Sequence, residues 1–176
     1  MALRTTSRLA ERLEPSPNAP DVYITGFEVT GADGRKIEDE ATLDRLGAII
    51  QRVLVGHLLD DRLLGLGYLA GLDHKQIDLL ITYRNYFVQV FQGFGTQSVD
   101  ETLLKHPHFA SLLVEYFETK FATERKESVA DRTEKLLPAL ARKYDELLHR
   151  VTAINEDLIL RYFIDLFEAT LRTNYY

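Results

Sequence analysis

The histidines offer the most versatile chemistry in this chain, and two of them, His106 and His108, flank Pro107. Two imidazoles at this spacing could bind a metal ion, but a metal site usually needs a third ligand, and proline is common at the first position of a helix. The other histidines form no arrangement with serine that is typical of a catalytic triad: His57, His74 and His149. Cysteine is absent, which excludes a thiolate metal site and a thiol nucleophile. The sequence therefore predicts no catalytic residue and no metal ligand.

Two glycine pairs resemble part of a dinucleotide-binding motif: Gly65-Leu66-Gly67 and Gly93-Phe94-Gly95. That motif places its glycines between a strand and a helix, so that backbone amides reach the pyrophosphate of the cofactor. Neither pair follows a predicted strand, and both are interpreted as helix breaks or loops. The sequence predicts no cofactor-binding residue in this chain.

Charged residues alternate in sign along the last predicted helix. Asp157, Arg161 and Asp165 follow one another at four-residue intervals, as do Glu168 and Arg172. Paired carboxylates for general acid–base catalysis would need a cleft, which this alternation does not indicate. Opposite charges at helical spacing are typical of a solvated helix face, and that is the interpretation adopted for these residues.

The composition is that of a globular domain. The 176 residues are 45% hydrophobic and 27% charged, enough for one domain, or one domain with an arm, around a hydrophobic core. The formal net charge is -6 and the longest basic cluster is Arg125-Lys126, so neither a nucleic acid nor an anionic membrane is expected as a partner. No apolar run approaches the roughly 20 residues of a membrane span. Without a signal peptide or a cysteine, the protein is expected to be cytoplasmic.

The N-terminal part of the chain predicts little regular structure. Residues 1–20 are polar and contain three prolines in their last six positions, so they are predicted to be a flexible linker. Residues 21–38 contain a β-branched and aromatic run and the turn signal Asp33-Gly34, which predict a β-strand. A second short strand at residues 35–37 would complete a hairpin. An isolated hairpin is only marginally stable in water, so this strand is expected to need a neighbour.

Residues 39–176 have the apolar period of helices and predict a helical domain. The clearest apolar face belongs to one helix, at positions Phe109, Leu112, Leu113, Tyr116, Phe117 and Phe121. The predicted fold class is mainly α: an antiparallel, bundle-like helical domain with one short N-terminal β-strand or hairpin.

Helix boundaries are predicted from capping residues and prolines. Asp73 with Gln76, and Ser98 with Glu101, have the spacing of a capping box, and Asn155 is expected to cap the last helix. Two prolines are expected at helix starts because they cannot donate an interior hydrogen bond: Pro107 and Pro138.

Several segments, in this order, resemble the large NAD-specific glutamate dehydrogenases of bacteria, in the region directly before their catalytic core. The matching segments are Leu69-Ala70-Gly71-Leu72, Tyr83-Arg84-Asn85-Tyr86-Phe87, Gln92-Gly93-Phe94, His106-Pro107, Leu112-Leu113-Val114-Glu115-Tyr116-Phe117-Glu118, Asn155-Glu156-Asp157-Leu158 and Leu171-Arg172-Thr173-Asn174-Tyr175. The resemblance covers residues 21–176 and is strongest over the last 110 or so. Phe91 departs from it, since the family often has arginine before the glutamine.

The resemblance implies a parent enzyme that oxidatively deaminates glutamate to 2-oxoglutarate and ammonia with NAD, in glutamate catabolism. Its catalytic residues and its nucleotide-binding fold would lie beyond Tyr176, and ACT-like regulatory modules would precede residue 1. The partners of this segment would then be the catalytic and regulatory domains of the same polypeptide, within a homo-oligomer. The segment alone would be inactive and would bind no cofactor. The alternative is a free-standing helical adaptor or ligand-binding domain.

The last predicted helix, residues 155–172, has more apolar surface than contact with one neighbouring helix can bury. A helix that is apolar over most of its circumference must be enclosed. We therefore expect part of this helix and the residues after it to pack on the catalytic domain, through the interface residues Phe163, Phe167, Leu171 and Tyr175.

Overall fold

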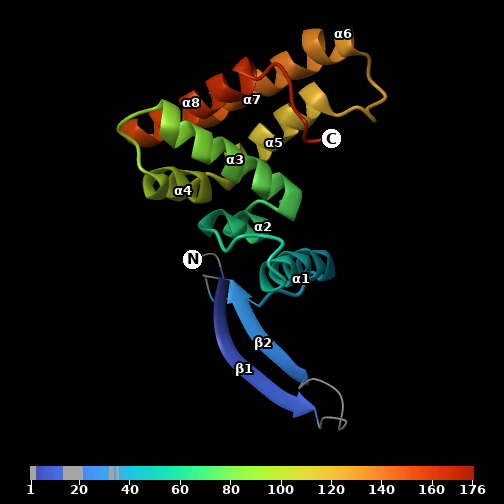
Figure 1. Cartoon of the computed structure of the whole chain (residues 1–176). Coiled ribbons are helices and arrows are strands. Elements are labelled where there is room, and N and C mark those ends of the chain that lie inside the picture. Colours follow the sequence, from blue (N-terminus) through green and yellow to red (C-terminus); the bar gives the residue numbers. More distant parts are fainter. Residues whose placement is uncertain (1–2, 14–21, 32–33, 35) are drawn as a thin grey trace.

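The computed structural model describes residues 3–13, 22–31, 34 and 36–176, and most of these residues are helical (Figure 1). The helical elements, in chain order, are α1 (Glu40–Leu54), η1 (Arg62–Gly65), α2 (Leu66–Leu69), α3 (His74–Val90), α4 (Thr96–Lys105), α5 (Pro107–Phe121), α6 (Val129–Asp131), η2 (Arg132–Leu136), α7 (Leu137–Leu148) and α8 (Ile154–Ala169). The mainly α fold class predicted from the helical periods is therefore confirmed. Among the described residues, no helix combines the length and apolar composition needed to cross a lipid bilayer.

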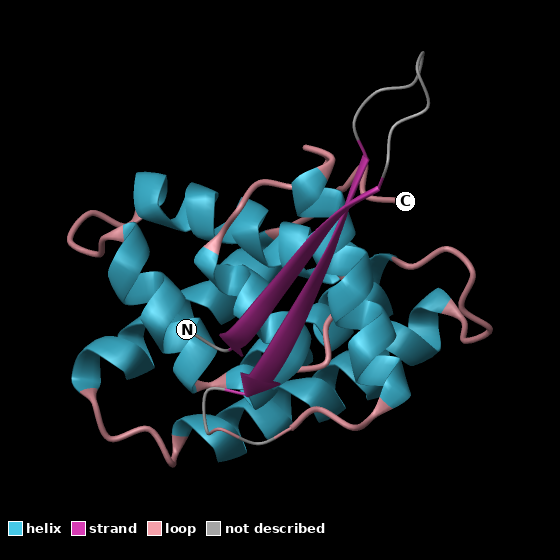
Figure 2. Cartoon of the chain, turned by 90° about the horizontal axis from the view of Figure 1, so that it is seen from below, coloured by secondary structure: helices cyan, strands magenta, loops and turns pink. Residues whose placement is uncertain are grey.

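The N-terminal part of the chain forms an antiparallel two-stranded ribbon of β1 (Leu3–Leu13) and β2 (Val22–Gly31). Figure 1 shows this ribbon extending away from the helices, and its two strands contact mainly each other. Figure 2, seen from below, looks along this direction, so the ribbon lies in front of a body made of helices joined by loops.

The ribbon corrects two expectations for the N-terminal residues. Strand β1 lies within the stretch predicted to be a linker, and it is β1, rather than residues 35–37, that pairs with β2. Lys36 forms only an isolated bridge with Thr30. Strand β1 pairs with the next strand along the chain, and the polar composition of residues 3–13 does not indicate this pairing. The prolines that suggested a linker occur at positions 15–20, outside the described residues.

Aromatic side chains pack α3 against α8 in an antiparallel arrangement. The ring centroids of Phe87 and Phe163 lie 5.0 Å apart and nearly parallel, and those of Phe91 and Tyr162 lie 4.3 Å apart. One turn earlier on α3, Tyr83 stacks on Phe167 at 3.9 Å. Residue numbers rise along α3 as they fall along α8, so the two helices run in opposite directions. The antiparallel bundle predicted from the sequence is found in this pair.

A second helix pair, α5 and α7, meets around a buried tyrosine. The ring of Tyr144 lies 5.4 Å from that of Phe109 and 5.9 Å from that of Tyr116. Its hydroxyl donates a hydrogen bond of 2.9 Å to the carbonyl oxygen of Leu112. The phenol thus keeps a partner in a site where an unpaired hydroxyl would destabilise the fold.

Some predicted helix boundaries are confirmed and others are wrong. Asp73 and Gln76 form the expected capping box at the start of α3, and Pro107 occupies the first turn of α5. Helix α4 instead begins at Thr96, so Ser98 already lies inside it. Helix α8 begins at Ile154 and has no side-chain cap, so Asn155 is not its capping residue. These two caps were inferred from local spacing, which does not decide in which turn a helix starts.

The glycine pairs have structural roles. A Cβ atom at Gly67 would lie 2.5 Å from Cδ1 of Ile49, so glycine at this position permits the close approach of α2 to α1. Gly93, three residues after the end of α3, has a φ of 111°, a conformation that favours glycine. Neither pair lies between a strand and a helix, which a nucleotide-binding turn would require.

Candidate functional site

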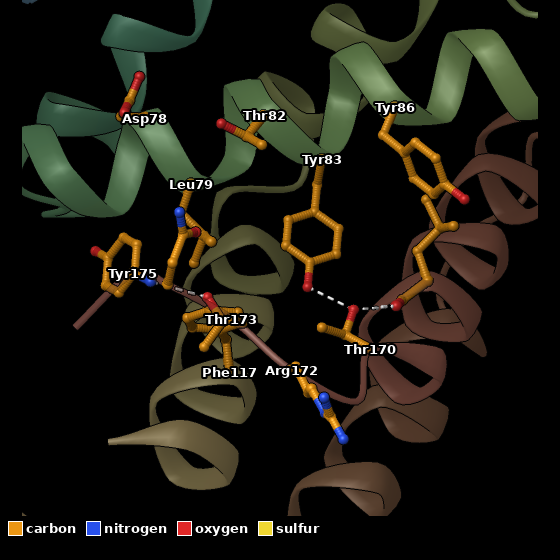
Figure 3. A pocket seen from close by; sticks show the side chains of 12 residues that line it. Asp78, Leu79, Thr82, Tyr83, Tyr86, Phe117, Thr170, Arg172, Thr173 and Tyr175 are labelled. Carbon is orange, nitrogen blue, oxygen red and sulfur yellow. Dashed lines mark hydrogen bonds between the residues drawn. The ribbon is translucent and has the colours of Figure 1, made fainter. Parts of the chain in front are cut away.

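A cavity of about 480 Å³ lies between α3, the end of α8 and the residues that follow α8 (Figure 3). We call residues 170–176 the C-terminal tail. The cavity is lined by Asp78, Leu79, Thr82, Tyr83, Tyr86, Phe117, Leu166, Thr170, Arg172, Thr173, Asn174 and Tyr175. Its walls are largely aromatic and aliphatic, and its polar groups are hydroxyls, one amide, one carboxyl and one guanidinium.

The start of the C-terminal tail is tied to α3 by a hydrogen bond. The hydroxyl of Thr170 donates to the carbonyl oxygen of Leu166 at 2.7 Å, so the Tyr83 hydroxyl, 2.7 Å from Thr170 Oγ1, is the donor to Thr170 (Figure 3). Burial raises the pKa of Tyr83, and the hydrogen bond with Thr170 offsets only part of this effect. The phenol therefore remains a neutral donor at physiological pH.

The end of the C-terminal tail packs on α5. The ring of Tyr175 meets that of Phe117 edge-on at 5.3 Å, and the ring of Tyr176 lies 6.5 Å from the same ring. Burial raises the pKa of Tyr175 to about 12. Lys120, also on α5, donates to the carbonyl oxygen of Glu168 at 2.7 Å and so caps the end of α8.

The four residues predicted to face the catalytic domain have different environments. Phe163 and Phe167 are 0% and 1% exposed and lie in the core of this chain, so their assignment to an interface is corrected. The apolar circumference of α8 is enclosed largely by the chain's own helices, α3, α4 and α5. Leu171 is 86% exposed, and Tyr175 is partly buried beside the cavity. These two remain the predicted interface residues.

The described residues also contain a buried ionic cluster that sequence analysis missed. Arg84 on α3 donates two hydrogen bonds to Asp61, of 2.7 and 3.0 Å, and one of 2.8 Å to Asp100 on α4. Arg84 is 5% exposed and Asp100 is 3% exposed. Burial lowers the pKa of Arg84, but its hydrogen bonds with Asp61 and Asp100 outweigh this and raise it. The sequence has one signal for the cluster, which is an arginine on a largely apolar helix.

Asp61 positions this arginine while it also caps η1. Its Oδ1 accepts from the backbone N–H of Leu63 at 2.9 Å. The cluster therefore joins η1, α3 and α4, with each charge paired in the interior. Arg84 faces the two carboxyl groups and does not line the cavity beside the C-terminal tail. We interpret the cluster as structural: its hydrogen bonds hold η1, α3 and α4 in place relative to one another.

His106, one of the two candidate metal ligands, binds a carboxyl group. Its Nε2 lies 2.9 Å from Oε2 of Glu156, whose other carboxyl oxygen accepts from Lys105 at 2.6 Å. The hydrogen bonds from Lys105 and His106 lower the pKa of Glu156. His108 is exposed. Among the described residues, no group of three or more histidine, aspartate or glutamate side chains is placed to bind a metal ion.

The charged face of α8 is partly as predicted. Arg161 donates to Asp157 at 2.8 Å, and the arginine side chain is half exposed, so this pair lies on a solvated face. Glu168 and Arg172 do not continue that face as a helical pair, because α8 ends at Ala169 and Arg172 belongs to the C-terminal tail. There the Arg172 side chain lines the cavity instead.

The arrangement of groups around the cavity suits binding or positioning. The threonine at its centre, Thr170, has its hydroxyl proton committed to the Leu166 carbonyl. No histidine lines the cavity, so none of its hydroxyl groups has an imidazole base beside it. The hydroxyl and aromatic groups instead connect α3, α5, α8 and the C-terminal tail.

Comparisons with known proteins agree with the resemblance. Residues 58–123 match the family model of glutamate dehydrogenase, helical motif 3. An NAD-specific glutamate dehydrogenase of Pseudomonas aeruginosa is 31% identical over all of this chain and 11% of its own length. Enzymes of the same name from Halomonas elongata and Mycobacterium tuberculosis are 32% and 31% identical, over 72% and 79% of this chain.

The chain spans only about a tenth of the length of these relatives. No solved structure matches it. The motif match covers η1 through α5, the part of the bundle that contains the Arg84 cluster, and the match to the Pseudomonas aeruginosa protein covers the whole chain. The chain therefore contains helical motif 3 of the glutamate dehydrogenases and represents a segment of the large NAD-specific enzymes of that family.

Proposed function

We propose that this chain is a non-catalytic helical element of an NAD-dependent glutamate dehydrogenase, which links regulatory modules of the enzyme to its catalytic core. The relatives carry the name of the enzyme, and the chain matches only about a tenth of their length. The parent would convert glutamate and NAD to 2-oxoglutarate, ammonia and NADH, as a cytoplasmic homo-oligomer in glutamate catabolism. NAD would bind elsewhere in the parent.

The observation that carries this proposal is the anchoring of the C-terminal tail. Tyr83 and Phe117 contact the two ends of the tail from two different helices, α3 and α5. A displacement of the bundle would therefore be transmitted to whatever follows Tyr176. The exposed side chain of Leu171, near the start of the tail, offers an apolar contact for the catalytic core.

The proposal is tested first on the isolated chain. Calorimetry with NAD, and an assay of glutamate oxidation, should show neither saturable binding nor turnover. Saturable micromolar binding of NAD would contradict a purely architectural role. The second test uses the longer dehydrogenase, in which Thr170→Val removes the hydroxyl that accepts from Tyr83 and donates to Leu166.

We expect Thr170→Val to change the activity of the longer enzyme while its helical content stays unchanged. Thr82→Val is the matched control, because Thr82 lines the same cavity without a hydrogen bond to the tail. Equal activity of the parent enzyme and both variants would contradict a role of the anchored tail in linking the bundle to catalysis.

The cavity beside the tail favours one alternative, a free-standing helical domain that binds a ligand. Its volume of about 480 Å³ falls within the range of roughly 300–1,000 Å³ that small-molecule sites occupy. The genomic sequence beyond Tyr176 separates the two candidates. An enzyme segment continues into a dehydrogenase core, whereas an adaptor does not.

A further inference from the structure

A second cavity, of about 220 Å³, lies where the start of α5 meets the end of α7. It shares no lining residue with the cavity beside the C-terminal tail. Four of its lining residues are basic: Lys105, His106, His108 and Arg150. The remaining lining residues are apolar: Pro107, Phe109, Leu147, Val151 and Leu160. The cavity thus combines an apolar floor with cationic and imidazole groups.

The charge of this cavity contrasts with that of the chain. The formal net charge of the protein is -6, yet no carboxyl group lines this cavity. Two of the basic residues share a counter-charge, Glu156 on α8, which binds Lys105 at 2.6 Å and His106 at 2.9 Å. Arg150 forms no ion pair with the residues that the structure describes. Glu156 therefore pairs with Lys105 and His106, whereas Arg150 and His108 have no carboxyl partner among the described residues.

We propose that this cavity binds a phosphate group. A tetrahedral dianion has several acceptor oxygens and can accept from a guanidinium, an ammonium and an imidazole at once, which a carboxylate with two oxygens does less well. The cavity is smaller than the roughly 300–1,000 Å³ typical of sites for drug-sized ligands, so it suits a single charged group.

The test is a titration of the chain with inorganic phosphate at constant ionic strength, monitored by two-dimensional amide NMR. We expect shifts that saturate at millimolar phosphate and are confined to the amides of Lys105, His106, His108 and Phe109 and of residues 147–151. Arg150→Gln should weaken binding by about tenfold, the effect of losing one charge-assisted hydrogen bond. Arg142→Gln is the matched control, since Arg142 is an exposed arginine on α7, two turns before Arg150, that does not line the cavity.

His108→Gln provides a second variant. His108 is exposed and has no described hydrogen-bond partner, so its replacement should leave the fold intact while it weakens binding. Glycerol 3-phosphate in place of inorganic phosphate distinguishes a phosphate monoester from the free ion, and tighter binding of either one identifies the source. Equal weakening by Arg150→Gln and Arg142→Gln, or shifts spread over all basic residues, would overturn the proposal, as would an equal response to chloride.

Discussion

The hydroxyl of Tyr83 lies 2.7 Å from that of Thr170, and this hydrogen bond joins the middle of α3 to the residue directly after α8. The same tyrosine ring stacks on Phe167, two residues before the end of α8. The bond and the stack together determine where the C-terminal tail leaves the bundle. A small change in the phenol should therefore affect both the stability of the bundle and the position of the tail.

Replacement of Tyr83 by phenylalanine should lower the free energy of unfolding by about 1 kcal/mol, because the hydroxyl is lost while the ring stack on Phe167 is kept. Urea denaturation followed by circular dichroism measures the change. Tyr86→Phe is the control, since Tyr86 is 55% exposed on the same helix and makes no described hydrogen bond. Equal losses in the two variants would show that the bond to Thr170 contributes nothing specific.

Replacement of Arg84 by methionine should lower the free energy of unfolding by about 3–5 kcal/mol, because Asp61 and Asp100 would lose their cationic partner inside the protein. Arg62→Met is the control. Arg62 pairs with Glu101 at 3.4 Å, but both side chains are more than half exposed, so the loss should be at most about 1 kcal/mol. Similar urea midpoints for the two variants would contradict the structural role assigned to the buried cluster.

The pairing of Glu156 should make stability depend on pH in the acid range. Lys105 and His106 lower the pKa of Glu156 below its ordinary value of 4.5 in the folded state. The resulting stabilisation is therefore fully present above the ordinary pKa and is lost as the pH falls through the folded-state pKa. Glu156→Gln should flatten the loss of stability between pH 6 and pH 3, because the group that titrates is removed.

Urea denaturation at a series of pH values measures this dependence. Glu146→Gln is the control, since Glu146 is an exposed carboxyl group on α7 without a described partner. This control should keep the pH dependence of the parent chain. A parent chain and a Glu156→Gln variant with parallel pH profiles would show that Lys105 and His106 do not lower the pKa of Glu156.

Leu171→Asp separates the surface of the tail from the core of the bundle. Leu171 is 86% exposed, so the substitution should change the unfolding free energy of this chain by less than about 0.5 kcal/mol. Phe167→Ala, four residues earlier, should cost about 3–5 kcal/mol because that ring is 1% exposed. Thermal denaturation compares the two variants.

In the longer dehydrogenase, Leu171→Asp should lower activity or assembly if the tail packs on the catalytic core. Unfolding of the isolated chain by this substitution would place Leu171 in the internal core. Full activity and normal assembly of the longer enzyme would show that Leu171 contacts no other domain.

The sequence by itself determined most of the helices and some of their ends. The helix from Pro107 and the capping box of Asp73 and Gln76 depend on interactions within four residues, and both are found in the structure. The mainly α class follows from the apolar period of residues 39–176, since that period requires no knowledge of distant contacts. The resemblance to glutamate dehydrogenases likewise rested on short segments in order.

Only the tertiary structure decided which side chains meet. The partners Tyr83 and Thr170 are 87 residues apart, and Arg84 finds Asp61 23 residues before it and Asp100 16 residues after it. Strand β1 was missed because its partner β2 is separated from it by the proline-containing stretch. Phe163 and Phe167 seemed available to another domain because a helical period shows that a face is apolar. Which neighbour covers that face depends on how the helices pack, and here α3 covers it.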